Sequence, residues 1–101
     1  MPVDRLDRAA AQTLLRKCLA AGQVKTSWHF RQELAKETIT FADVEFVLRS
    51  GNIYGAPEQE AKTGEWKYKV EGLCADRQNI AVVFCFKQVD RVLLITVFSV
   101  K

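Results

Sequence analysis

The chain has 101 residues, of which 49% are hydrophobic and 27% charged, with 15 basic against 12 acidic side chains and a formal net charge of +3. This length and composition predict one globular domain and exclude a disordered chain, and no apolar run approaches the roughly 18 residues of a membrane span. The N-terminus also lacks the apolar core of a signal peptide. We therefore expect a cytoplasmic protein that makes no membrane contact.

The cysteines and acidic residues form no recognisable metal set. Cys18, Cys74 and Cys85 are odd in number and contain no CxxC pair, which favours reduced, buried thiols. The sequence also lacks a P-loop, a GxGxxG turn, an HExxH helix and a GxSxG elbow. We therefore expect a domain that works without a metal ion or an organic cofactor.

The N-terminal part of the chain has the residue spacing of a helix. Apolar residues three and four positions apart predict a first helix over residues 5–21. Asp4 or Asp7 can cap its start, and Gly22 is suited to its end. Residues 23–27 form a short link that is also suited to an edge strand.

Two further helices are predicted after this link. Ser27 is a preferred N-cap residue and predicts a second helix over residues 28–37. Thr40 predicts the start of a third helix, because Thr40 and Asp43 have the spacing of a capping box with Asp in place of Glu. Gly51 ends this third helix.

The second half of the chain changes to the two-residue period of strands. This alternation predicts strands over residues 52–60, 65–74, 80–87 and 92–100, with turns over residues 62–64, 75–78 and 89–90. Gly55 and Pro57 place the first of these strands at a sheet edge. The last two strands are apolar on both faces, which is typical of central strands covered on both sides.

The strand over residues 65–74 carries an apolar set and a charged set of side chains on opposite faces. The two sets are Trp66, Tyr68 and Val70, and Lys67, Lys69 and Glu71. We expect the apolar set to face the second and third helices.

Together these elements predict an α+β fold in which N-terminal helices pack on a four-stranded antiparallel β-meander. Residues 1–22 form a helical extension and residues 23–101 form the α+β domain, within one globular unit. The first helix is expected to cover part of the other face of the sheet, or to lie across a partner.

His29 is the single histidine, and it lies at the start of the second predicted helix. An imidazole exchanges protons near neutral pH, so His29 is a candidate general acid or base. Glu33 follows four positions later. The alternative is therefore a helix-terminal histidine that is hydrogen bonded to the backbone or to Glu33.

Lys67 and Lys69 share one strand face and lie roughly 7 Å apart, close to the phosphate spacing of an RNA strand. Two cations at this spacing can bind phosphates and stabilise the charge that develops when RNA is cleaved. The alternative is a solvated strand face on which the lysines pair with Glu65 and Glu71.

Four more side chains are candidates for contacts with RNA. Tyr54 and Tyr68 can stack on bases, although the alternation predicts that Tyr68 belongs to the core. Arg77, in a predicted turn, and Lys87, at a strand end, can each reach a phosphate or remain solvated.

Five segments form a recognisable series along the chain: Trp28–Arg31, Ile39–Val44, Val47–Ile53, Lys67–Gly72 and Ile95–Phe98. They combine a His and an Arg on one helix, Ile-Thr-x-x-Asp-Val at the start of the next, and a Gly followed by Ile. This pattern, over about residues 24–100, resembles a family of small bacterial proteins of uncharacterised domain type. Members of that family look like relatives of the RelE, BrnT and MqsR toxins of toxin–antitoxin modules.

The resemblance implies a compact RelE/BrnT-like α+β fold, metal-free cleavage of mRNA and a tight protein partner, the antitoxin. In such toxins the 2′-hydroxyl attacks the adjacent phosphate, while side chains supply acid, base and charge stabilisation. At matching positions the resemblance implies catalytic roles for His29, Lys67, Tyr68 and Lys69, and an RNA-binding role for Arg31.

We therefore expect the toxin of a two-gene module, an mRNA endoribonuclease that acts freely or on the ribosome. Two alternatives stay open. One is a non-enzymatic interaction module, such as a homodimer, and the other is a degenerate toxin fold retained as a regulator. An apolar outer face on the last two strands favours the interaction module, because such a face needs a cover. Its expected members are Val83, Cys85, Ile95 and Val97.

Overall fold

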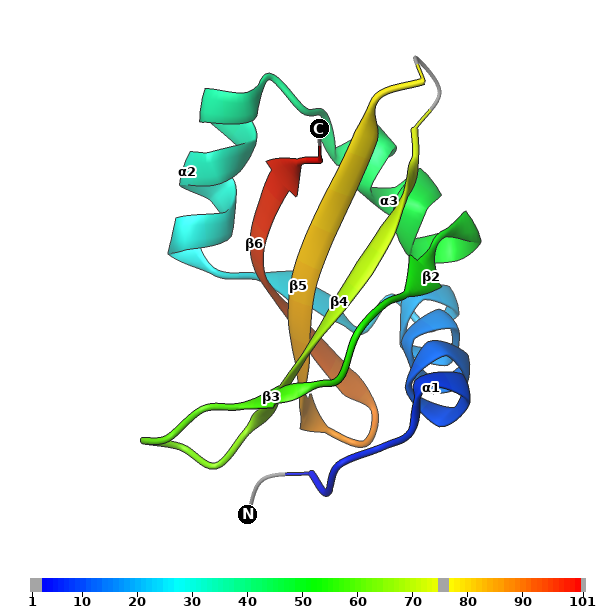
Figure 1. Cartoon of the computed structure of the whole chain (residues 1–101), viewed down its shortest axis with the longest axis vertical. Helices are drawn as coiled ribbons and strands as arrows, with labels where there is room; N and C mark the ends of the chain where they lie inside the picture. The colour runs from blue at the N-terminus through cyan, green and yellow to red at the C-terminus, as the bar shows by residue number, and fades with distance from the viewer. Residues whose placement is uncertain (1–2, 75–76, 101) are drawn as a thin grey trace.

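The computed structural model describes residues 3–74 and 77–100, in which it places three helices and six strands (Figure 1). The helices are α1 (Arg8–Ala20), α2 (Trp28–Glu37) and α3 (Phe41–Ser50). The strands are β1 (Val24–Thr26), β2 (Asn52–Ile53), β3 (Glu58–Gln59), β4 (Trp66–Leu73), β5 (Asn79–Gln88) and β6 (Arg91–Ser99). The predicted turn over residues 75–78 begins with Ala75 and Asp76, which lie outside the described residues.

α2 and α3 begin where their capping residues predict. The Oγ of Ser27 accepts a hydrogen bond from the backbone N–H of Phe30 at 3.0 Å. Thr40 and Asp43 form a complete capping box, in which each side chain accepts from the backbone N–H of the other residue. These bonds satisfy amides that have no partner within the helix, so the predicted helix starts are confirmed.

α1 is shorter than the predicted helix over residues 5–21. It starts at Arg8 because Asp7, and not Asp4, is its N-cap. Gly22 follows the helix with a φ of 70°, the left-handed conformation expected after a helix end. In the part of the chain that the structure describes, no helix is long and apolar enough to cross a membrane.

The strands form one mixed sheet in the order β1-β6-β5-β4-β2, with β3 also paired to β4. β4 is antiparallel to β2, β3 and β5, and β5 is antiparallel to β6. β1 runs parallel to β6 at the far edge, so the link over residues 23–27 does pair as an edge strand. The predicted α+β class is confirmed, but a mixed sheet replaces the predicted four-stranded antiparallel meander.

The predicted strand over residues 52–60 is two short strands, β2 and β3. Gly55 has a φ of 75°, outside the range of extended backbone, and Pro57 has no amide hydrogen to donate to a neighbouring strand. These two residues interrupt the pairing with β4. The chain therefore pairs with β4 in β2 and again in β3, but not over the residues between these two strands.

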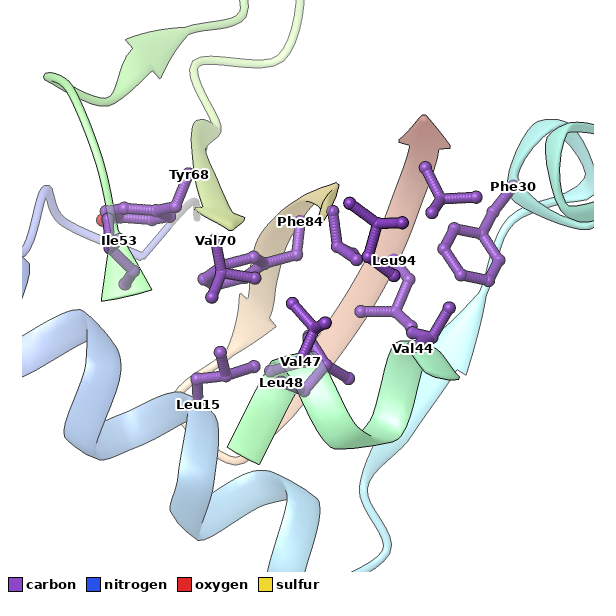
Figure 2. Packing of buried hydrophobic residues seen from close by; sticks show 14 of the residues in the cluster. Leu15, Phe30, Val44, Val47, Leu48, Ile53, Tyr68, Val70, Phe84 and Leu94 are labelled. Atoms are coloured by element: carbon purple, nitrogen blue, oxygen red, sulfur yellow. The ribbon is translucent and has the colours of Figure 1, made fainter. Parts of the chain in front are cut away.

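All three helices contribute to one core on a single face of the sheet. Figure 2 shows Leu15 of α1, Phe30 of α2 and Val47 of α3 within the buried cluster that also contains Val70 and Phe84 of the sheet. α1 packs beside α3 in this core. α1 therefore does not cover the opposite face of the sheet, which was one of the two positions predicted for the first helix.

An irregularity in the pairing of β5 with β6 changes which residues of β6 face the core. Val83 is paired with Thr96 and Phe84 with Leu94, so Ile95 is an extra residue without a partner in the register. Such a bulge reverses the alternation beyond it. Val97 is consequently fully buried beneath the helices, and its expected place on the outer face is wrong.

Candidate functional site

We call the face of the sheet that points away from the helices the open face. Directly paired residues on antiparallel strands project to the same side, so the side chains of this face form rows across β4, β5 and β6. The rows are Glu71–Ala81–Phe98, Lys69–Val83–Thr96 and Lys67–Cys85–Leu93. None of these residues belongs to the buried cluster under the helices.

Two adjoining depressions of about 300 and about 410 Å³ lie on the open face. Lys67 and Ile95 line both of them, so the two adjoin, and we call them together the groove. The chain between β2 and β4 crosses the sheet near one end of β4 (Figure 1) and contributes Glu58 to one depression and Glu60 to the other. The groove therefore has a largely apolar floor and charged walls.

Lys67, Lys69 and Lys87 on the open face each have a carboxylate within 4 Å. The N–O distances are 3.5 Å for Lys67–Glu60, 3.4 Å for Lys69–Glu71 and 2.8 Å for Lys87–Glu65. The hydrogen bond from Lys87 to Glu65 raises the pKa of that ammonium group. From the sequence, one alternative was pairing of Lys67 and Lys69 with Glu65 and Glu71. Lys69 does pair with Glu71, whereas Lys67 pairs with Glu60 and Glu65 pairs with Lys87.

Cys85 lies in the floor of the groove between Lys67 and Leu93. Burial raises the pKa of its thiol, and the Glu65 carboxylate raises it further. A thiol with a raised pKa is a poor nucleophile at neutral pH. The structure therefore supports the expectation that Cys85 is a packing residue.

His29 and Arg31 lie on α2, beside the sheet edge formed by β1 and β6 (Figure 1). The His29 side chain is 60% exposed, and its Nε2 lies 3.9 Å from Glu33, too far for a hydrogen bond. The hydroxyl of Ser27 donates to the backbone carbonyl of Ile95 at 2.9 Å, which ties the start of α2 to a residue that lines the groove. The Arg31 guanidinium lies 5.8 Å from the Trp28 ring centroid.

Tyr68 lies on the opposite face from Lys67 and Lys69, as its alternation with them predicts. It is 3% exposed, and its ring is stacked on Phe84 with the centroids 5.5 Å apart. Its hydroxyl oxygen accepts a hydrogen bond from the backbone N–H of Leu6 at 2.9 Å. The phenol that the resemblance implies in catalysis is therefore directed into the helix side of the sheet.

The two remaining candidates lie away from the groove. Tyr54 is exposed beside the β4 edge, where it lines a depression of about 580 Å³ with Leu73 and Asn79. Arg77 is exposed in the connection between β4 and β5, with a φ of 68° and its backbone N–H donated to Cys74. Neither side chain lines the depressions that contain Lys67.

The structure thus brings Lys67, Lys69 and Lys87 to one face and directs the ring of Tyr68 to the other. It adds Phe98 and Thr96, which sequence reasoning did not single out. No sequence signal distinguishes these two residues, because β6 is apolar on both sides and its bulge is invisible without the partner strand. Among residues 3–74 and 77–100, no group of three or more His, Cys, Asp or Glu side chains is placed to hold a metal ion.

The strands that form the groove lie within a segment that matches one protein family. Residues 26–99 match a family described as "Domain of unknown function (DUF4258)". The comparisons with curated proteins and with solved structures gave no match. The matched range includes His29 and the whole of β2 to β6, whereas α1 precedes it. Because the match spans most of the sequence, the chain belongs to the DUF4258 family.

Proposed function

We propose that this domain is a metal-independent endoribonuclease that binds single-stranded mRNA in the groove of the open face and acts as the toxin of a toxin–antitoxin module. The observation that carries the proposal is the position of Lys67, Lys69 and Lys87 on one face of the sheet, where Lys67 and Lys69 line the groove between β3 and β6. Two lysines two residues apart on a strand match the spacing of successive phosphates on an extended RNA strand.

The lysines are available to phosphates although each has a carboxylate partner. Exposed ion pairs contribute only about 0–1 kcal/mol, so exchanging a carboxylate for a phosphate costs little. Lys69 and Lys87 are nearly half exposed in their side chains. Binding of an RNA strand also releases the counterions that surround its phosphates, which favours binding; a single carboxylate offers no such gain.

The proposed reaction needs only proton transfer and charge stabilisation. The 2′-oxygen of a nucleotide forms a bond to the adjacent phosphorus while the bond from phosphorus to the 5′-oxygen breaks. His29, on the helix whose start Ser27 ties to Ile95 of the groove, accepts the proton of the 2′-hydroxyl. The 5′-oxygen takes a proton from water, and the resulting hydroxide takes the proton from His29. Lys67 and Lys69 stabilise the charge on the phosphate oxygens. The products are a 2′,3′-cyclic phosphate and a 5′-hydroxyl end.

The first test uses the purified chain with single-stranded RNA in the presence of EDTA, and it measures the rate of cleavage and the chemistry of the new ends. We expect 5′-hydroxyl ends from the wild type. The double variant Lys67→Met and Lys69→Met keeps the aliphatic stems that cover the sheet but removes both charges. It should lower the cleavage rate on the order of 100-fold or more, while its circular dichroism spectrum is unchanged.

A matched control removes the same number of charges elsewhere. Lys17 and Arg49 lie on α1 and α3, and the double variant Lys17→Met and Arg49→Met should retain cleavage. His29→Asn should lower the rate roughly 100-fold or more if His29 moves the proton. Equal rates for the wild type and the folded Lys67/Lys69 variant would reject the roles assigned to these lysines.

A second experiment addresses the biological role. The chain is expressed without a partner in a bacterial host, and growth is followed while new mRNA 5′ ends are mapped. We expect growth arrest and recurrent new ends, both relieved by the cognate antitoxin. Normal growth with folded protein and unchanged mRNA would contradict a toxin.

A protein-interaction module is the second candidate, and a specific observation favours it. Val83, Leu93 and Ile95 form a half-buried apolar strip between balanced Lys–Glu pairs on the open face. An apolar centre with a charged rim of both signs is typical of protein interfaces. Under this alternative the chain sediments as a dimer or binds another protein. The folded chain would then cleave no RNA, and the substitution Ile95→Glu in the apolar strip would abolish the association.

A further inference from the structure

Phe98 is the aromatic residue that the central strands turn toward the open face. The other aromatic residues of β4, β5 and β6, namely Trp66, Tyr68, Phe84 and Phe86, belong to or pack against the core under the helices. Phe98 is 36% exposed, although it is paired in register with the fully buried Ala81. Phe98 lies near the end of β6, outside the buried cluster under the helices, and its ring is accessible to a ligand on the open face.

The position of Phe98 relative to the lysines is set by strand pairing. Phe98, Ala81 and Glu71 form one row, and the next row is Thr96, Val83 and Lys69. Neighbouring rows on one face are roughly 7 Å apart along the strands, and β4 and β6 are roughly 10 Å apart across β5. Both intervening residues of β5 are small or short, so no large side chain separates the Phe98 ring from the Lys69 ammonium group.

The chemistry of this arrangement matches one nucleotide. Lys69 holds a phosphate on the β4 side, and the ring on β6 offers a flat apolar surface for the base that belongs to it. Stacking of a base on an aromatic ring is favourable for every base, because each base has a π face. Phenylalanine has no hydrogen-bonding group, so the contact selects for stacking area and favours purines over pyrimidines.

The geometry points to Phe98 as the base-stacking platform of the open face, which orients a purine nucleotide whose phosphate contacts Lys69. This inference rests on the proposed RNA binding and adds to it a binding residue and a preference among bases. Phe98 acts on binding and orientation, and it takes no part in proton transfer.

The test uses a 2′-O-methyl RNA hexanucleotide with one 2-aminopurine, which cannot be cleaved by attack of the 2′-oxygen. Stacking on an aromatic ring quenches the fluorescence of 2-aminopurine. We expect quenching on binding to the wild type. Phe98→Leu keeps an apolar side chain over Ala81 but removes the ring, and it should weaken binding roughly 5- to 150-fold with loss of the quenching. Phe98→Trp should restore both.

Phe46→Leu is the matched control, since Phe46 is 49% exposed but lies on α3, on the helix side of the sheet. It should bind and quench like the wild type. Wild-type affinity and quenching in a folded Phe98→Leu protein would overturn the stacking role and leave the proposed RNA binding intact. If the wild type binds no RNA at any salt concentration, both the stacking role and the proposed function are wrong. Equal affinity for purine and pyrimidine probes would overturn the base preference.

Discussion

The backbone N–H of Leu6 donates a hydrogen bond to the hydroxyl oxygen of Tyr68 at 2.9 Å, across 62 residues of sequence. The segment before α1 is thereby attached to the central strand β4. Arg5 strengthens the attachment, because its guanidinium lies 5.6 Å from the ring centroid of Trp66 on the same strand. The N-terminal segment is part of the fold and covers the edge of the core beside Tyr68.

Removing this hydrogen bond should reduce stability and leave RNA cleavage unchanged. Tyr68→Phe deletes the acceptor of the Leu6 amide, and we expect the free energy of unfolding to fall by about 1 kcal/mol in urea titrations. Tyr54→Phe is the control, because Tyr54 is exposed and its loss should have no effect. A more than tenfold loss of cleavage in folded Tyr68→Phe would instead support the catalytic role that the resemblance implies for Tyr68.

Gly51 should tolerate no side chain, because the backbone of β4 approaches it closely. A Cβ at this position would lie 2.6 Å from the carbonyl oxygens of both Glu71 and Val47. We expect Gly51→Ala to lower the free energy of unfolding by about 3 kcal/mol, since neither carbonyl can move without breaking backbone pairing.

Gly55→Ala separates this steric effect from backbone strain. Gly55 has a φ of 75°, and a Cβ there would have open space around it. Alanine at Gly55 should therefore cost about 1 kcal/mol through the left-handed backbone alone. Thermal unfolding of the two variants side by side checks the order, and a larger loss in Gly55→Ala would contradict the close approach at Gly51.

The capping box of α3 predicts a loss of stability that is specific to Thr40. Its hydroxyl accepts from the amide of Asp43 and also donates to the Asp43 carboxylate. Thr40→Ala should lower the free energy of unfolding by about 1 kcal/mol. Ser50→Ala, at the other end of the same helix, should change it by less than about 0.5 kcal/mol. Similar values for the two variants would show that the box contributes nothing.

The buried thiols should react slowly and make the fold sensitive to alkaline pH. Burial raises the pKa of Cys18 and of Cys85, so both thiols remain protonated in the folded chain where an unfolded chain has begun to lose the protons. The unfolded state then binds fewer protons, and stability falls as pH rises above about 8.5.

Urea titrations between pH 8 and 9.5 measure this slope, and the double variant Cys18→Ala and Cys85→Ala should reduce it. With a thiol reagent at pH 8, the native chain should react on the order of 100-fold more slowly than in guanidinium, because reaction needs local opening. One thiol that reacts at once in the native chain would show that a cysteine is accessible.

Local signals in the sequence were sufficient for the starts of α2 and α3 and for the placement of Lys67 and Lys69 on one face of β4. The caps at Ser27 and Thr40 are hydrogen bonds to amides three residues later, so their determinants lie within a few positions. The alternation in β4 likewise places Lys67 and Lys69 on one face and Tyr68 on the other, whatever strand lies beside them. The fold class followed from the change of period after Gly51.

The tertiary structure decided which residues surround the lysines. The bulge at Ile95 depends on the pairing of β5 with β6, and it moves Val97 into the core and sets Phe98 on the open face. The parallel pairing of β1, the approach of Glu60 to Lys67 and the contact of Leu6 with Tyr68 join residues distant in sequence. The alternation of residues along a strand predicts which side chains share a face. It does not predict the register between strands, because contacts with the whole sheet and its helices set the register.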